Sequence, residues 1–74
     1  MSKLAGISGK EAVKKFRKLG YVVTRRKGSH VRMKHPKPNI YKPLTIPMHK
    51  ELKIGLLAQL LKDTNLTIDE FLSL

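Results

Sequence analysis

The feature that constrains the fold most is a pair of short segments with the pattern of a β-hairpin. The second segment, residues 30–35, alternates polar and apolar side chains, with Val31 and Met33 in the apolar phase. Because successive side chains of a strand point to opposite faces, this pattern predicts a strand with one buried and one solvated face. The first segment, residues 21–26, is rich in the β-branched and aromatic residues that favour strands, and Lys-Gly-Ser at 27–29 is typical of a tight turn.

The length of this turn decides which basic side chain lies beside His30. A three-residue turn pairs Arg26 with His30 and points Tyr21 and Val23 toward the core. A two-residue turn pairs Arg25 with His30 instead, and it exposes Tyr21 and Val23. The residues alone leave both registers open, but each of them puts a cation next to the imidazole.

Helix signals frame the hairpin on both sides. Ser-Gly-Lys-Glu at 8–11 is a capping box, in which the Ser hydroxyl and the Glu carboxylate each bind a free backbone N–H, so a helix should begin at Gly9. Gly20 suits the left-handed conformation that ends many helices. Residues 54–62 repeat Ile and Leu at helical spacing, and Thr-Ile-Asp-Glu at 67–70 is a second capping box that opens a short terminal helix.

A third strand is predicted over residues 44–48, where apolar and polar side chains alternate again. Pro47 cannot donate to a sheet ladder, so this strand should lie at an edge or stop pairing near the proline. The resulting order, α-β-β-β-α with a short C-terminal helical extension, is an α+β fold in a single domain over residues 1–74. Because so short a chain has one core, both helices should pack on one face of the sheet and leave the other face open to water.

Charge and composition limit the classes of function. The chain has 16 Lys and Arg against 5 Asp and Glu, and its net charge of +11 favours a polyanionic partner. A chain of 74 residues has no room for a deep cleft between two lobes. It has no Cys, which excludes disulfides, thiolate zinc sites and a Cys nucleophile. Without a long apolar stretch, the chain is expected to be cytoplasmic and to have no membrane partner.

The open face of the sheet is where the sequence predicts chemistry. Alternation puts His30, Arg32 and Lys34 on this face, and the hairpin adds Arg26 and Lys27. Cationic neighbours favour an uncharged imidazole, which can accept a proton at neutral pH. Such a base could take the proton of a ribose 2′-hydroxyl while the cations stabilise the charge that develops on the phosphate. DNA lacks this hydroxyl, so the chemistry would select RNA.

Each of these residues also has a plainer interpretation. A surface His on a basic strand more often meets solvent or phosphate and does no chemistry. Gly28 is ordinary in a hairpin turn, and the Ser29 hydroxyl can bond to the local backbone. Alternation turns His35 to the opposite face from His30, and His49 follows the third strand, so the three His should not converge on a metal.

A set of short motifs runs in order along nearly the whole chain: Ser-Gly-Lys-Glu at 8–11, Leu-Gly-Tyr at 19–21, Arg-Arg-Lys-Gly-Ser-His-Val at 25–31, His-Pro at 35–36, Ile-Pro at 46–47, Glu-Leu-Lys at 51–53 and Thr-Ile-Asp-Glu-Phe-Leu at 67–72. With these motifs the chain resembles the HicA (YcfA-like) family of bacterial and archaeal mRNA interferase toxins. The Lys-Gly-Ser-His core, followed by an alternating strand, is the most specific part of the resemblance.

The resemblance implies a fold similar to the double-stranded-RNA-binding domain and the toxin role in a type II toxin–antitoxin system. It implies that the His of the Gly-Ser-His motif, His30, is the catalytic residue of a ribonuclease that cleaves mRNA and blocks translation. It also implies a HicB-type antitoxin that covers the active site and usually has the DNA-binding role, so no direct DNA binding by this chain alone is expected. No cofactor or metal is expected. The RNA-binding residues predicted beside His30 are Arg26, Lys27, Gly28, Ser29, Arg32 and Lys34.

Two functions therefore compete. The first is a metal-independent endoribonuclease in which His30 is a general base or acid. The second is a non-catalytic module that grips double-stranded RNA with the same surface, since binding needs the same cations and tolerates a His. A DNA-binding regulator is weaker, because no helix combines a preceding helix-turn with polar residues suited to reading bases.

Overall fold

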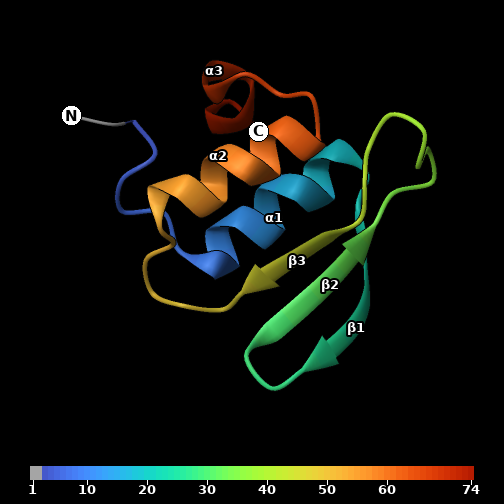
Figure 1. Cartoon of the computed structure of the whole chain (residues 1–74), viewed down its shortest axis with the longest axis horizontal. Coiled ribbons are helices and arrows are strands. Elements are labelled where there is room, and N and C mark those ends of the chain that lie inside the picture. The colour runs from blue at the N-terminus through green and yellow to red at the C-terminus, as the bar shows by residue number, and fades with distance from the viewer. Residues whose placement is uncertain (1–2) are drawn as a thin grey trace.

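The computed structural model describes residues 3–74, which form two layers (Figure 1). One layer is a three-stranded antiparallel sheet in the order β1-β2-β3, and the helices pack against one of its faces. The predicted α-β-β-β-α order with a C-terminal helical extension is confirmed. In chain order the elements are α1 (Gly9–Leu19), β1 (Val22–Lys27), β2 (His30–Lys34), β3 (Leu44–Pro47), α2 (Ile54–Asp63) and α3 (Ile68–Leu72).

Helix α1 begins and ends at the predicted residues. The Ser8 hydroxyl accepts a hydrogen bond from the backbone N–H of Glu11 at 3.0 Å, as an N-cap residue should. The Ser8 hydroxyl also donates to the Glu11 carboxylate at 3.3 Å. The Ser8 half of the predicted capping box is therefore confirmed, whereas the Glu11 carboxylate bonds to the Ser8 hydroxyl and not to a backbone N–H. Gly20 ends the helix with a φ of 115°. Ala12 and Phe16 are fully buried, so one face of α1 packs against the core.

The core lies between the helices and the inner face of the sheet. Phe16 is at its centre, with ring centroids 5.7 Å from Tyr21 and 5.2 Å from Phe71. Phe71 belongs to α3 and is fully buried, so the C-terminal extension contributes directly to the core. The strands and α2 supply further buried apolar side chains, namely Val31, Met33, Leu44, Ile46, Leu57, Leu60 and Leu61.

An aromatic cluster lies at the end of the sheet away from the hairpin turn. The buried Tyr21 donates its hydroxyl hydrogen to the backbone carbonyl of Lys42 at 2.7 Å. Burial raises the pKa of Tyr21 to about 12, and the nearby carboxylate of Asp63 adds to the rise. The ring of His35 stands 4.2 Å from that of Tyr41 and 5.0 Å from that of Tyr21, so His35 lies on the core side of β2, opposite to His30.

The register of the β1–β2 hairpin differs from both predicted registers. The turn contains two residues, 28–29, and pairs Lys27 with His30. The predictions that Arg26 or Arg25 stands opposite His30 were therefore wrong. One part of the three-residue register is confirmed, namely that Tyr21 and Val23 point inward. Tyr21 is buried and Val23 packs against the core.

A β-bulge at Thr24 explains this combination. Val23 pairs with Met33 and Lys27 pairs with His30, so β1 contains one residue more than β2 between the same two pairs. The core requires Val23 to face inward, whereas the turn requires Lys27 to face outward beside His30. A strand of period two cannot satisfy both requirements over four residues, and one extra residue restores the phase.

The remaining elements match their predictions closely. β3 is an edge strand and its pairing ends at Pro47, as expected for a residue with no N–H. At α3 the capping box is complete, with Thr67 and Glu70 exchanging backbone-to-side-chain hydrogen bonds. The N–H of Thr67 lowers the pKa of the Glu70 carboxyl below its ordinary value. No helix within residues 3–74 is long and apolar enough to span a membrane.

Candidate functional site

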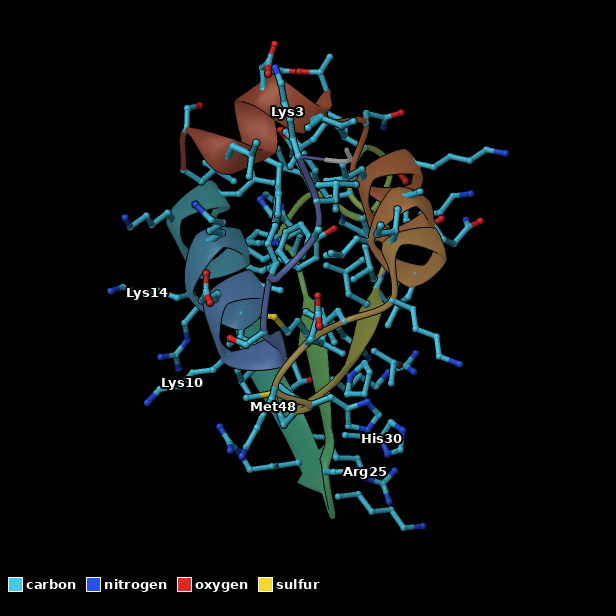
Figure 2. The ribbon with its side chains drawn as sticks, turned by 90° about the vertical axis from the view of Figure 1, so that its left-hand side faces the viewer. Lys3, Lys10, Lys14, Arg25, His30 and Met48 are labelled. Atoms are coloured by element: carbon cyan, nitrogen blue, oxygen red, sulfur yellow. The ribbon has the colours of Figure 1, made fainter. Side chains whose placement is uncertain are left out.

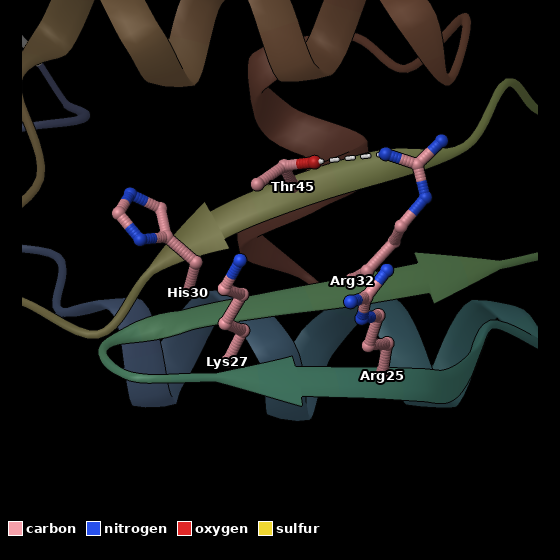
Figure 3. Close-up of a pocket in the computed structure, with 5 residues that line it drawn as sticks. All are labelled: Arg25, Lys27, His30, Arg32 and Thr45. Atoms are coloured by element: carbon pink, nitrogen blue, oxygen red, sulfur yellow. Dashed lines mark hydrogen bonds between the residues drawn. The ribbon is translucent and has the colours of Figure 1, made fainter.

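The open face of the sheet, which the helices leave uncovered, carries one basic cluster. We define the open-face cluster as Arg25, Lys27, His30, Arg32 and Thr45, whose side chains point to the same side of the sheet (Figure 3). Together they line a shallow hollow of about 180 Å³. Pockets for drug-sized molecules usually measure about 300–1,000 Å³. The hollow therefore suits one group of a larger ligand that lies across the surface.

Strand pairing fixes the position of His30 within this cluster. His30 is the first residue of the central strand, and it pairs with Lys27 on one side and with Pro47 on the other. Two residues along the same face, Arg32 pairs with Arg25 and with Thr45. The imidazole is exposed and is flanked by cations from two strands.

Arg32 is oriented by the third strand. Its Nη1 donates a hydrogen bond of 3.5 Å to the Thr45 hydroxyl, which turns the guanidinium across the face toward β3 (Figure 3). At 3.5 Å this contact is long for a hydrogen bond, so it directs the side chain more than it stabilises it. The guanidinium keeps donors free for an anion.

The turn residues shape the end of the cluster. Gly28 has a φ of 57°, a left-handed conformation that a side chain would strain, although no atom lies within 4 Å of where a Cβ would be. The backbone carbonyl of Ser29 accepts a hydrogen bond from the N–H of Met48 at 2.6 Å. This bond ties the turn to the segment after β3, so that His30 begins a strand anchored on both sides.

The predicted site residues divide between the two faces of the sheet. Lys27 and Arg32 lie in the open-face cluster with His30, and Lys34 lies on the same face at the far end, paired with Val22. Arg26 pairs with the buried Val31, so its side chain extends from the opposite face, beside α1. The expectation that Arg26 lies on the open face was wrong because the bulge at Thr24 reverses the phase of the strand.

Arg25 and Thr45 are the members of the cluster that the sequence prediction of the site omitted. Thr45 carried a signal, because the alternation of residues 44–48 already placed it in the polar phase. Arg25 carried a weaker signal, because only the register with a two-residue turn placed it beside His30. Its observed place on the open face, opposite Arg32, depends on the bulge.

The cluster is electropositive and has no acidic member. The ion pair found among residues 3–74 joins Lys3 to Asp69, far from the open face, at 3.1 Å between two exposed side chains. Four nitrogen-bearing side chains thus share one surface without a carboxylate to neutralise them. Such a surface attracts anions, and most strongly a polyanion that contacts several cations at once.

The three His residues lie in different parts of the structure. His30 is on the open face, His35 is in the aromatic cluster, and the carbonyl of His49 accepts a hydrogen bond from the N–H of Gly9. Within residues 3–74, no group of three or more His, Asp or Glu side chains is close enough to hold a metal ion.

Comparison with known proteins identifies relatives of this chain. Residues 9–66 match the model of a family described as the HicA toxin of bacterial toxin–antitoxin systems. Among solved structures, a chain of a toxin–antitoxin complex from Streptococcus pneumoniae is similar, with a TM-score of 0.65 and 33% sequence identity. The match covers 80% of this chain and 97% of that one. No curated protein sequence matches the chain.

Proposed function

The chain belongs to the HicA toxin family, and on this premise we propose that it is the toxin of a type II toxin–antitoxin pair, an endoribonuclease that cleaves mRNA in the cytoplasm without a metal cofactor. The observation that carries the proposal is the open-face cluster. It holds one exposed imidazole between cations from two strands, with no carboxylate among them. We assign His30 the catalytic role.

The cluster supports a transesterification in which RNA supplies its own nucleophile. His30 removes the proton of a ribose 2′-hydroxyl, and the 2′-oxygen then attacks the adjacent phosphorus. A bond forms from the 2′-oxygen to phosphorus while the bond from phosphorus to the 5′-oxygen breaks. The leaving 5′-oxygen takes a proton from the solvent, which has free access to this face. The products are a 2′,3′-cyclic phosphate and a 5′-hydroxyl.

The cations supply the electrostatic part of this reaction. Lys27 is directly across from His30, and Arg32 is two residues along the same face. Negative charge builds up on the non-bridging phosphate oxygens in the transition state, and fixed cations stabilise it. Arg25 extends the same surface, and Lys34 would hold a phosphate further along the RNA. We propose that Gly28 and Ser29 contact the RNA backbone through the turn.

A HicB-type antitoxin is the proposed protein partner. The similar chain from Streptococcus pneumoniae comes from a toxin–antitoxin complex. An acidic antitoxin surface laid over the open-face cluster would neutralise its cations and exclude RNA from His30. This mode of inhibition needs no conformational change in the toxin.

The competing function is a module that binds double-stranded RNA and does no chemistry. The test compares the wild-type chain with His30→Ala in an assay with a long single-stranded RNA in the presence of EDTA. We expect the wild type to cut the RNA and the variant to be at least about 100-fold slower, the smaller end of the contribution that a general base makes. RNA affinity should be retained.

The control is His49→Ala, which removes an exposed imidazole that does not line the open-face cluster. It should cut RNA at the wild-type rate. If neither the wild type nor His49→Ala cleaves RNA while all three proteins bind it equally, the chain is a binding module and the ribonuclease proposal is wrong.

A further inference from the structure

A second cationic surface lies on the other side of the sheet. We define the α1 groove by the residues that line a hollow of about 280 Å³ between α1 and the hairpin. Figure 2 shows Lys10 and Lys14 projecting on the α1 side, while Arg25 and His30 project from the opposite side. The lining residues are Lys10, Val13, Lys14, Arg17, Arg26 and Met48.

The groove has a cationic rim and an apolar floor. Lys10, Lys14 and Arg17 follow the i, i+4, i+7 spacing, so they form one row along α1 that is about 10 Å long at 1.5 Å per residue. All three are exposed, and Val13 and Met48 between this row and the strand are buried and half-buried. Such a floor can accept the apolar face of a base or a ribose while the rim holds phosphates.

No Asp or Glu lines the groove. The ion pair present in residues 3–74 uses none of the groove cations. Four positive charges therefore surround one hollow, and a ligand with repeated negative charges would match them.

The α1 groove and the open-face cluster meet at the hairpin. Arg26 and Lys27 are consecutive, and their side chains extend from opposite faces because Arg26 pairs with the buried Val31 and Lys27 pairs with His30. β1 is an edge strand, so only its free edge and the turn at 28–29 separate the two surfaces. A flexible chain can pass from one surface to the other around this edge.

We propose that a single RNA strand occupies both surfaces, with the phosphodiester to be cut on the open-face cluster and the continuing strand wrapped around the β1 edge into the α1 groove. This inference rests on the proposed ribonuclease function. RNA is favoured over an acidic protein because the groove continues the surface where the RNA is cut, and because its row of cations above an apolar floor suits alternating phosphates and bases. The α1 groove increases the affinity for RNA and takes no part in the reaction, which His30 catalyses.

The length of the RNA provides the first test. The molecule measures 33 × 27 × 18 Å, so a strand must be longer than its thinnest dimension to reach both faces. A four-nucleotide oligouridine has only about three phosphodiester groups, too few for the open-face cluster and the row of α1 cations together, whereas a 20-nucleotide oligouridine has about nineteen. Only the longer RNA can occupy the open-face cluster and the α1 groove together.

The variant that tests the groove is the triple substitution Lys10→Gln, Lys14→Gln and Arg17→Gln, made in the His30→Ala background so that the RNA stays intact. Gln is a good helix former, so α1 should persist, and circular dichroism verifies this. The matched control is Lys37→Gln, Lys53→Gln and Lys62→Gln, which removes the same charge from exposed positions outside both surfaces. The single substitution Arg26→Gln tests the α1-groove cation that lies next in the chain to Lys27 of the open-face cluster.

We expect the groove triple variant to bind the 20-nucleotide RNA about tenfold more weakly than the control triple variant. The slope of log affinity against log salt should fall by about 0.7 for each phosphate that the protein no longer neutralises, or about 2 for the groove triple variant. Arg26→Gln should lower the slope by about 0.7. Binding of the four-nucleotide RNA should be equal for the groove and control variants.

Equal affinities of the two triple variants for the 20-nucleotide RNA would overturn the proposal. So would a groove triple variant that loses affinity only for the antitoxin, since the groove would then belong to the protein partner. The two proposals fail separately. With His30 restored, a wild-type chain that cuts no RNA contradicts the ribonuclease function, whereas cleavage with no length-dependent defect in the groove variant contradicts only the extended RNA path.

Discussion

The two strands of the hairpin use similar residues under different constraints. β2 alternates exposed and buried side chains without interruption, and its cations all face the solvent. β1 has a single half-buried position among exposed ones, and its bulge at Thr24 decides which face each of the consecutive Arg25 and Arg26 takes. β2 lies between two strands, where a break in the ladder would cost hydrogen bonds on both sides. β1 is an edge strand, so it can absorb the mismatch between the turn and the core.

This difference matters for function because it distributes charge. A regular β1 with Val23 facing inward would point Arg26 to the open face and would turn Arg25 and Lys27 to the α1 side. The bulged strand instead supplies Arg25 and Lys27 to the open-face cluster and Arg26 to the α1 groove. One extra residue in an edge strand thus gives Arg25 and Lys27, and not Arg26, to the face that carries His30.

The strongest test of this contrast between β1 and β2 compares two single-residue deletions, one of Arg32 in β2 and one of Thr24 in β1. Without Arg32, Val31 and Met33 become neighbours and must face opposite sides, so one leaves the core. Each side chain contributes about 1.5–3 kcal/mol through burial. A chain of this size has a net stability of only about 4–11 kcal/mol. We expect the Arg32 deletion to abolish the cooperative unfolding transition in circular dichroism.

Deletion of Thr24 should be mild by the same measurement. It removes the bulged residue and leaves the pairs of Val23 with Met33 and of Arg25 with Arg32 in phase. The expected change in the free energy of unfolding is under about 1.5 kcal/mol, comparable to the loss of the 3.4 Å hydrogen bond from the Thr24 hydroxyl to the Arg32 carbonyl. Unfolding of both deletion variants would contradict the bulge as the origin of the phase change.

The two adjacent arginines provide the next test. Arg25→Gln removes a cation from the open-face cluster, and we expect cleavage of a four-nucleotide RNA to slow about tenfold, which corresponds to about 1.4 kcal/mol. Arg26→Gln removes the same charge from the opposite face and should leave this rate within about twofold of the wild type. Single-turnover rates measure both variants. Equal losses would mean that the two side chains share one face, contrary to the observed register.

The smallest effect at neutral pH concerns Tyr21, which fixes the start of β1. Tyr21→Phe removes the hydrogen bond to the Lys42 carbonyl and should cost about 1 kcal/mol. The folded state raises the pKa of Tyr21 from 10.0 to about 12, so the folded chain keeps this proton better than the unfolded chain. Its stabilisation is complete below pH 10 and is lost as the pH rises toward 12.

Urea unfolding between pH 9 and pH 12 measures this effect, with Tyr21→Phe as the matched variant. The wild type should lose stability more steeply than the variant, since Lys and Arg titrate alike in both. Parallel curves would show that the Tyr21 hydroxyl does not hold its proton in the fold as described.

Much of the fold could be predicted from local patterns. The caps of α1 and α3, the alternation of β2 and the edge position of β3 each depend on residues that are close in the chain. The place of His30 on the open face followed from the alternation of β2 alone, since Val31 and Met33 must face the core. The family resemblance rested on the same local motifs, and the match over residues 9–66 agrees with it.

The amino-acid sequence by itself determined the elements, their order, and the outward phase of His30, Arg32 and Lys34, because each depends on a period that neighbouring residues set. Only the tertiary structure decided the register of β1. Val22, Val23 and Thr24 are all acceptable in a strand, and no local signal indicates which of them is skipped. The bulge falls at Thr24 because the strand must both enter a two-residue turn and keep Val23 inward. Its position decides that Arg25 lies on the open face and Arg26 on the opposite face.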